Sequence, residues 1–321
     1  MKKSLVLLLL SSLVSGLYAR QPRTVVEPPF AFRNSGTLEI ERIELAPEST
    51  TVYIQAYFRP HNWIRISSET YIRTGAEGEK LTVRSADGMP LDTEFYMPET
   101  GRHDFSLSFP PVDPKTAKID LIESDCPDCF KIYDIDLTGK KAKPGCSALA
   151  KKYKKAAPLT ENFTAPVVSD SPARIAGAIT GYDPRFFDRI EIAFYSPIVG
   201  DGATELSVPV REDGSFETGL NILTPIRGML FLPGFVTLPF YAEPGRETAL
   251  EIDLEAVYRK TSVFKELHPQ TSPVAYYGEL GRVNEELARL QKIQIRTGTL
   301  HIGYHFDRLT RIHGMRPEQY K

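Results

Sequence analysis

The sequence has few cysteines, a single tryptophan and no excess of basic residues. Its 39 lysines and arginines are balanced by 41 acidic residues, giving a net charge of -2. A nucleic-acid-binding protein needs a concentrated basic surface, so this class of partner is excluded. The G-x-S-x-G elbow, the Walker loop, the G-x-G-x-x-G turn and the class A β-lactamase set are all missing. The sequence therefore indicates no catalytic residue and no cofactor.

Long apolar runs are also missing, except at the N-terminus. Lys2 and Lys3 precede an apolar run from Leu5 to about Leu17, and small residues follow it. This layout predicts a secretory signal peptide over residues 1–19, and an uncleaved membrane anchor is the alternative. The run is too short to span a bilayer comfortably. We therefore expect an exported protein, periplasmic or associated with the cell envelope, with no stable transmembrane segment.

Residues 23–139 read as short strands. Apolar residues alternate in TTVYIQAYFRP and HDFSLSF, and proline and glycine separate the runs. This pattern favours an immunoglobulin-like β-sandwich. In LEIERIEL, and again between Ile132 and Tyr133, the apolar residues change parity, which predicts a β-bulge in each strand. Trp63 is expected to pack in or beside the core.

The same alternation recurs in residues 173–255 and predicts a second, smaller β-sandwich. Asp213-Gly214 lies between two of its strands and suggests a type I′ hairpin turn. The fold class is therefore mainly β, with two antiparallel β-sandwich domains followed by a short α-helical tail.

Residues 140–172 join the two sandwiches and carry seven lysines between Lys140 and Lys155. A solvated linker with one short helix is the simpler interpretation. A basic patch that docks on an anionic membrane surface or an acidic partner is the alternative. Asn162-Phe163-Thr164 has the form of a glycosylation sequon, relevant only in a eukaryotic secretory pathway.

Helical spacing replaces the alternation in the tail, residues 256–321. Ser272 and Pro273 read as a helix start, and an apolar stripe follows. Its members are Tyr276, Leu280, Val283, Leu287 and Leu290. A second helix is expected from about 300 to 313. Residues 315–321 look like the start of a further helix, so we expect a truncated chain.

Cys126-Pro127-Asp128-Cys129 is the most suggestive short string. Strand-like residues flank it, so it is placed at a hairpin tip without the helix N-terminus that activates redox C-x-x-C pairs. A structural disulfide or an inert pair is favoured, and a redox dithiol is the alternative. Zinc needs four ligands, and Cys146 is the one cysteine left over. Cys146 is expected to be an unpaired thiol or to exchange partners.

Two further groups of residues are candidates for binding. His301 and His305 have the spacing of a metal pair, but a third ligand is missing, so surface histidines are favoured and no metal site is predicted. Tyr53, Tyr57 and Tyr96 could form a face that stacks on sugars or binds a protein. Packing or isolated surface positions are the simpler interpretation of these tyrosines.

With these residues in view, the chain resembles the front part of secreted TlpA-like thiol-disulfide oxidoreductases, which belong to the thioredoxin family of Gram-negative bacteria. The resemblance rests on PPFAFRNSGTLEIERIEL, GMPLDTEFYMPETG, FKIYDIDLTGK, FYAEPGRETALEIDL and MRPEQYK. It implies accessory modules that precede a thioredoxin domain with a W-C-x-x-C motif. This chain has no such domain, because Ile64 follows Trp63 and the C-x-x-C string lies in the accessory region.

Three functions follow from these observations. The first is an exported accessory or binding protein that works with a protein partner or a thioredoxin-like domain in the envelope. The second is a free-standing surface module that binds a glycan or a protein, which a contiguous exposed aromatic patch would favour. The third is a redox protein that uses Cys126 and Cys129. The sequence leaves the ligand, the oligomeric state and the disulfide pairing open.

Overall fold

The computed structural model describes residues 22–139, 168–196, 202–265 and 272–290. The chain divides into two compact units: residues 1–142 with Ser262–Lys265, and residues 143–261 with 266–321. The expected signal peptide, most of the lysine-rich linker and the expected helix at 300–313 lie outside the described residues. Among the residues that are described, no helix has both the length and the apolar character needed to cross a membrane.

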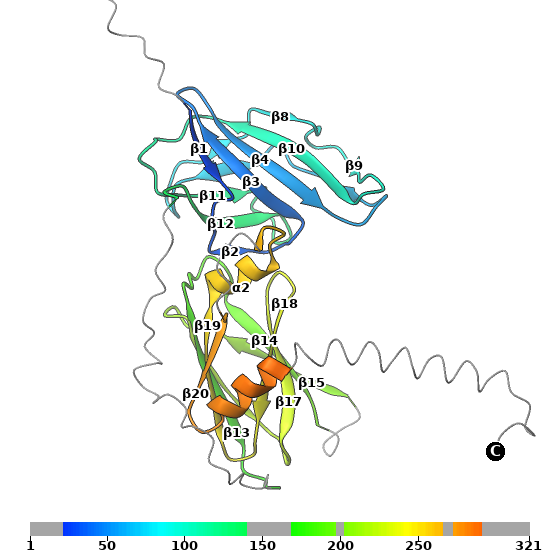
Figure 1. Ribbon diagram of the computed structural model, residues 1–321, viewed down its shortest axis with the longest axis vertical. Coiled ribbons are helices and arrows are strands. Elements are labelled where there is room, and N and C mark those ends of the chain that lie inside the picture. Colours follow the sequence, from blue (N-terminus) through cyan, green and yellow to red (C-terminus); the bar gives the residue numbers. More distant parts are fainter. Residues whose placement is uncertain (1–21, 140–167, 197–201, 266–271, 291–321) are drawn as a thin grey trace, which may run out of the picture. The chain divides into compact units, whose positions relative to one another are not determined.

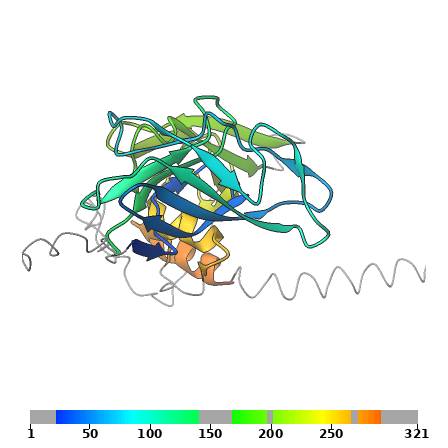
Figure 2. The same ribbon diagram turned by 90° about the horizontal axis from the view of Figure 1, so that it is seen from above.

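The first unit consists of two five-stranded antiparallel sheets that share one core. Figure 1 shows the ribbon of this unit from one side and Figure 2 shows it from above. The first sheet has the order β1-β3-β4-β10-β8, formed by Arg23–Val26, Leu38–Leu45, Thr50–Tyr57, Arg102–Phe109 and Ser85–Asp87. The second has the order β2-β12-β11-β6-β7, formed by Phe32–Arg33, Lys131–Asp136, Lys118–Ile122, Tyr71–Arg73 and Leu81–Thr82. Two short strands, β5 (Trp63–Ile64) and β9 (Phe95–Tyr96), pair separately.

Both predicted bulges of this unit are present. In the β3–β4 pair, Ile40 lies opposite Ile54 and Arg42 opposite Tyr53, so Glu41 is the extra residue. In the β11–β12 pair, the register shifts between Ile119 and Leu121. A parity change in a half-buried strand requires such an extra residue, because otherwise half of its apolar side chains would face solvent.

The second unit pairs two four-stranded sheets. One has the order β16-β13-β19-β20, formed by Ser215–Leu220, Ala173–Thr180, Glu247–Asp253 and Val274–Tyr277. The other has the order β15-β14-β17-β18, formed by Ala203–Pro209, Arg189–Tyr195, Ile226–Leu232 and Val236–Ala242. Among the described strands, β13 and β19 are the exception to antiparallel pairing. Helix α2 (Leu254–Thr261) follows β19, and the predicted mainly-β fold with short helices is confirmed.

The Asp213-Gly214 turn differs from the prediction. Strands β15 and β16 belong to different sheets, so the turn is a crossing between sheets. Gly214 has a φ of 79°, whereas Asp213 is outside the positive-φ region that a type I′ turn requires at both central positions. The Asp213 carboxylate instead accepts hydrogen bonds from the backbone N–H and the hydroxyl of Ser215, at 3.0 and 2.6 Å.

The predicted helix start at Ser272 and Pro273 is wrong. Residues Val274–Tyr277 form β20, which pairs with β19, and the helix begins after Gly278 and covers 281–290 among the described residues. The spacing of Tyr276 and Leu280 matched a helix, but pairing with the open edge of β19 satisfies the backbone groups of 274–277.

The helix at 281–290 closes an edge of the other sheet. The side-chain amide of Asn284 accepts the backbone N–H of Tyr241 on the edge strand β18 at 2.7 Å and donates to its carbonyl oxygen at 3.1 Å. The hydroxyl of Tyr276 donates to the carbonyl of Pro239 at 2.6 Å. These side chains take the place of a neighbouring strand, which removes a site for edge-to-edge association.

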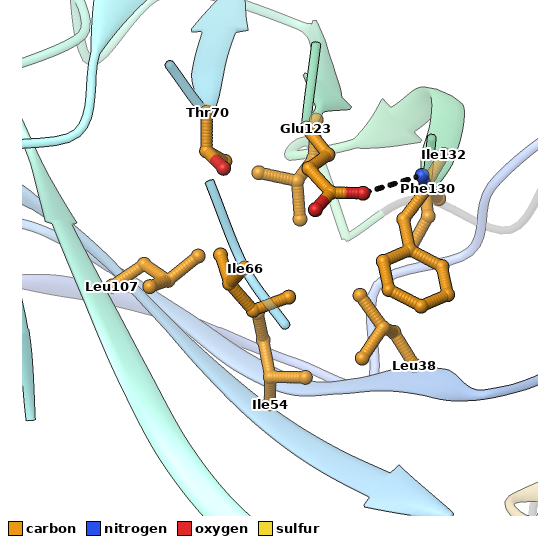
Figure 3. A pocket seen from close by; sticks show the side chains of 9 residues that line it. Leu38, Ile54, Ile66, Thr70, Leu107, Glu123, Phe130 and Ile132 are labelled. Carbon is orange, nitrogen blue, oxygen red and sulfur yellow. Dashed lines mark hydrogen bonds between the residues drawn. The ribbon is translucent and has the colours of Figure 1, made fainter. Parts of the chain in front are cut away.

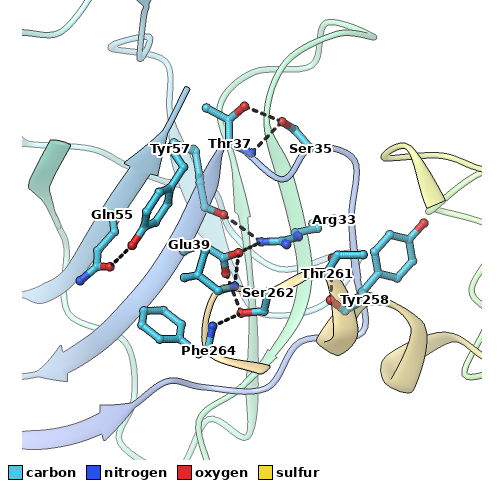
Figure 4. A network of polar contacts seen from close by, with 12 residues as sticks. Arg33, Ser35, Thr37, Glu39, Gln55, Tyr57, Tyr258, Thr261, Ser262 and Phe264 are labelled. Carbon is cyan, nitrogen blue, oxygen red and sulfur yellow. Dashed lines mark hydrogen bonds and ion pairs between the residues drawn. The ribbon is translucent and has the colours of Figure 1, made fainter. Parts of the chain in front are cut away.

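A buried ion pair marks the first unit (Figure 4). Nη1 of Arg33 lies 2.7 Å from Oε1 of Glu39, and both side chains are 2% exposed. The hydroxyl of Ser262 donates to Oε2 of Glu39 at 3.0 Å, and the backbone N–H of Val263 donates to Oε1 at 3.2 Å. The short segment Ser262–Lys265 thus supplies two of the donors that a buried carboxylate needs.

We expect Glu39→Ala to lower the free energy of unfolding of the first unit by about 3–5 kcal/mol, because it leaves the Arg33 guanidinium buried without its carboxylate. Urea unfolding of the full chain measures this change. The matched control is Asp104→Ala, which breaks an exposed ion pair with Arg102 in the same unit and should change stability little. Equal effects of the two substitutions would contradict the assignment.

Candidate functional site

Two large aromatic side chains lie exposed on the short β5–β9 ribbon of the first unit. Trp63 is directly opposite Tyr96, and Ile64 is directly opposite Phe95. Directly opposite residues of an antiparallel pair point to the same side, and successive residues alternate. Ile64 is 4% exposed and Phe95 packs against the core, whereas Trp63 is 47% and Tyr96 is 60% exposed. Trp63 and Tyr96 therefore share the outer side, which we call the aromatic face.

Backbone hydrogen bonds and one buried side chain fix the ribbon that carries this face. The N–H of Met97 donates to the carbonyl of Asn62 at 2.9 Å, and the N–H of His61 donates to the carbonyl of Met97 at 3.0 Å. The Met97 side chain is 2% exposed, so it anchors the ribbon in the core. The aromatic face is thus held on the main sandwich and is preformed.

Polar groups border the aromatic face. The phenol of Tyr96 donates to Oε2 of Glu94 at 2.9 Å, and this hydrogen bond raises the pKa of Tyr96 above its usual value. Tyr96 therefore stays neutral through the physiological range. Nε2 of His61 lies 3.2 Å from Oε1 of Glu99, and both side chains are largely exposed. Glu94 thus contacts the aromatic face directly, and His61 and Glu99 lie two and three residues from Trp63 and Tyr96 in the chain.

The other aromatic candidates lie elsewhere. The phenol of Tyr53 donates to Glu44 at 3.0 Å, and that of Tyr57 donates to Gln55 at 2.7 Å, so both are half-buried in side-chain contacts. Trp63 lies beside the core and not in it, because it is 47% exposed and its neighbour Ile64 fills the core position. Alternation along a strand would distinguish the inward Ile64 from the outward Trp63. A two-residue strand is too short to show this alternation.

The C-x-x-C string forms a disulfide. Cys126 and Cys129 are joined across a Cα–Cα distance of 5.3 Å. They lie in the turn between β11 and β12, the hairpin position that the sequence predicts, and the neighbouring described elements are strands. The helix N-terminus that lowers the pKa of a redox thiol is therefore not at this position.

Side chains of other strands hold this turn in place. The amide of Asn34 donates to the carbonyl of Cys129 at 2.7 Å. On the other side, the carboxylate of Asp125 accepts a hydrogen bond from the hydroxyl of Tyr71 at 2.9 Å and one from Nζ of Lys80 at 2.8 Å. These contacts and the disulfide together fix the turn, which indicates that the disulfide has a structural role.

A narrow apolar cleft opens between the two sheets next to this turn (Figure 3). Leu38, Ile54 and Leu107 line one side of it. Glu123 and Phe130 stand at the other, and the Glu123 carboxylate accepts the backbone N–H of Phe130 at 3.0 Å. Burial raises the pKa of Glu123 above its usual value. Because its carboxylate already accepts a backbone hydrogen bond, Glu123 serves to fix the hairpin.

The remaining predicted site residues are not described by the structure. Cys146, His301 and His305 all lie outside the described residues. Within the described ranges, no group of three or more histidine, cysteine, aspartate or glutamate side chains is arranged to hold a metal ion.

Comparisons with known proteins place the chain in no family. No protein-family model and no curated protein matches it. Two solved structures with a partial likeness are pullulanase type I from Bacillus subtilis complexed with maltose and pullulanase from Anoxybacillus sp. LM18-11 complexed with maltotriose. Each shares 8% identity over 60% of this chain, with TM-scores of 0.23 and 0.22. The chain spans 23% and 24% of their length, and a likeness this low carries no conclusion.

We expect Glu123→Gln to change how stability depends on pH. The pKa of Glu123 is raised in the folded state, so the folded protein binds this proton more tightly than the unfolded chain does. Stability contributed by the protonated form is present below the unfolded pKa and is lost as the pH rises through the folded pKa. Relative to the wild type, the glutamine variant should therefore gain stability as the pH rises from below the unfolded pKa of the carboxyl through its raised folded pKa, as measured by urea unfolding. A difference that does not vary with pH would contradict this.

We expect the double variant Cys126→Ser, Cys129→Ser to lose up to about 2 kcal/mol of stability, the loop-entropy value for a short closed loop. In an insulin-reduction assay with dithiothreitol, wild type and variant should show the same rate. Faster reduction by the wild type would make the hairpin cysteines a redox site.

Proposed function

We propose that this protein is an exported binding module of the cell envelope, and that its ligand covers the aromatic face of the first unit. The observation that carries the proposal is the pair Trp63 and Tyr96, exposed on the same side of a ribbon that is anchored in the core. Scattered exposed apolar side chains are ordinary on protein surfaces. Two adjacent large aromatic rings on a preformed support are typical of a binding surface.

The envelope location is supported by the N-terminal sequence. Lysines followed by an apolar run and small residues match a signal peptide. The resemblance to the region before the thioredoxin domain of TlpA-like proteins supports the same compartment. On this proposal the chain is an accessory part of an envelope system and works beside a protein partner or a thioredoxin-like domain.

A redox function of Cys126 and Cys129 is the less supported alternative. These residues are joined in a turn between two strands, and side chains from other strands hold that turn. The arrangement favours a structural disulfide over one that exchanges electrons.

The proposal is tested by sedimenting the full chain with insoluble envelope material from a Gram-negative bacterium. Wild type should bind saturably, and Trp63→Ala and Tyr96→Ala should each weaken binding at least tenfold, because each removes one of the two rings. The matched control is Tyr195→Ala, which removes a 54% exposed tyrosine from the second unit and should bind like the wild type. If all four proteins sediment equally, the aromatic face is not the binding surface.

A further inference from the structure

We infer that the ligand of the aromatic face is a neutral polysaccharide whose sugar rings stack on Trp63 and Tyr96. This inference rests on the function proposed above and names the class of its ligand. A pyranose ring has two apolar faces of C–H bonds and a border of hydroxyl groups. Its counterpart in a protein is a flat aromatic ring with hydrogen-bonding side chains at its edge. The first unit presents this combination.

The placement of the rings fits a chain of sugars. Trp63 and Tyr96 are directly opposite each other on β5 and β9. In an antiparallel pair, opposite Cβ atoms are about 4.5–5.5 Å apart, a distance comparable with the length of one sugar ring. Side chains at this spacing form one continuous apolar platform. The platform is wide enough for neighbouring sugars, so an oligosaccharide should bind more tightly than a single sugar.

The polar border selects hydroxyl groups over charged groups. Glu94 and Glu99 present carboxylates, which can each accept hydrogen bonds from adjacent hydroxyls of one sugar. His61, beside Glu99, adds an imidazole that can donate or accept. Arg59, in the turn before the ribbon, is exposed and carries the opposite charge, so the border has no strong excess of either sign and does not favour a charged polymer. A neutral polysaccharide can stack its sugar rings on the aromatic side chains and form hydrogen bonds with the polar side chains at their border.

The small size of the apolar surface separates a sugar from a protein ligand. Fully buried aromatic side chains cover about 150–250 Å² each, and part of both rings is already covered by the protein. A stable protein interface buries about 800 Å² on each partner. Among the neighbouring exposed residues, Arg59, Asn62 and Glu94 are polar, and Phe58 adds one further ring that is 40% exposed. The exposed apolar area therefore matches a ligand of a few sugar rings.

The test uses the fluorescence of Trp63, which is the only tryptophan of the chain and lies in the proposed site. The full chain is titrated with cellohexaose, maltohexaose, chitohexaose and mannohexaose, and with the corresponding monosaccharides. We expect a saturable change with at least one hexasaccharide, at least tenfold tighter than with its monosaccharide. Tyr96→Ala should weaken that binding at least tenfold. Tyr96→Phe keeps the ring and should weaken it less, and Tyr195→Ala should leave it unchanged.

The outcomes separate this inference from the proposed function. If no hexasaccharide changes the fluorescence, while the full chain still binds envelope material through Trp63 and loses that binding after the material is treated with protease, the ligand is a protein. The sugar inference is then overturned, and the binding module stands. A hexasaccharide that binds Tyr96→Ala as tightly as the wild type would also overturn it, because the sugar would then not stack on Tyr96.

Discussion

The buried ion pair between Arg33 and Glu39 is the constraint on which the first unit depends. Two charges removed from water are tolerated only when their remaining hydrogen-bonding capacity is filled. Leu38 supplies a carbonyl to Arg33, and Ser262 and Val263 supply donors to Glu39. Residues more than two hundred positions away in the sequence therefore complete the environment of one carboxylate, which makes Ser262–Lys265 part of this unit.

This pair is connected to the proposed binding surface through the first sheet. Glu39 lies opposite Gln55 on β4, and β4 pairs along its whole length with β10. Beyond these strands the backbone N–H of Phe58 donates to the carbonyl of Gly101 at 3.0 Å, and the chain continues into β5 on one side. The aromatic face lies on a separate two-stranded ribbon, which the chain joins directly to the sheet that contains Glu39. A surface preformed in this way loses little conformational freedom when a ligand binds.

Strand periodicity made most of the fold predictable from the sequence. Where strands were long and half-buried, as in β3 and β10, alternation located them, and parity changes located the bulges at Glu41 and in β12. The burial of one face of such a strand can be read from its sequence, because every second side chain must enter the core. The mainly-β fold follows from many such segments.

The errors arose where tertiary contacts outweigh local pattern. Residues 274–277 have helical spacing, but the open edge of β19 recruits them as β20. The burial of Glu39 has no local signal, because its donors come from a distant segment. Whether Trp63 lies in the core or beside it could not be read from the sequence, because β5 is only two residues long. The proposed binding surface therefore depends on the pairing of β5 with β9, which the sequence does not show.

The central claim is that the ligand binds on the aromatic face, and hydrogen exchange with and without bound ligand tests it most directly. The amides of the full chain would be followed in the presence and absence of a saturating polysaccharide. The account predicts added protection confined to residues 58–64 and 94–102, the segments that carry and border Trp63 and Tyr96. Protection confined to the second unit, or to the turn that holds Cys126 and Cys129, would contradict it.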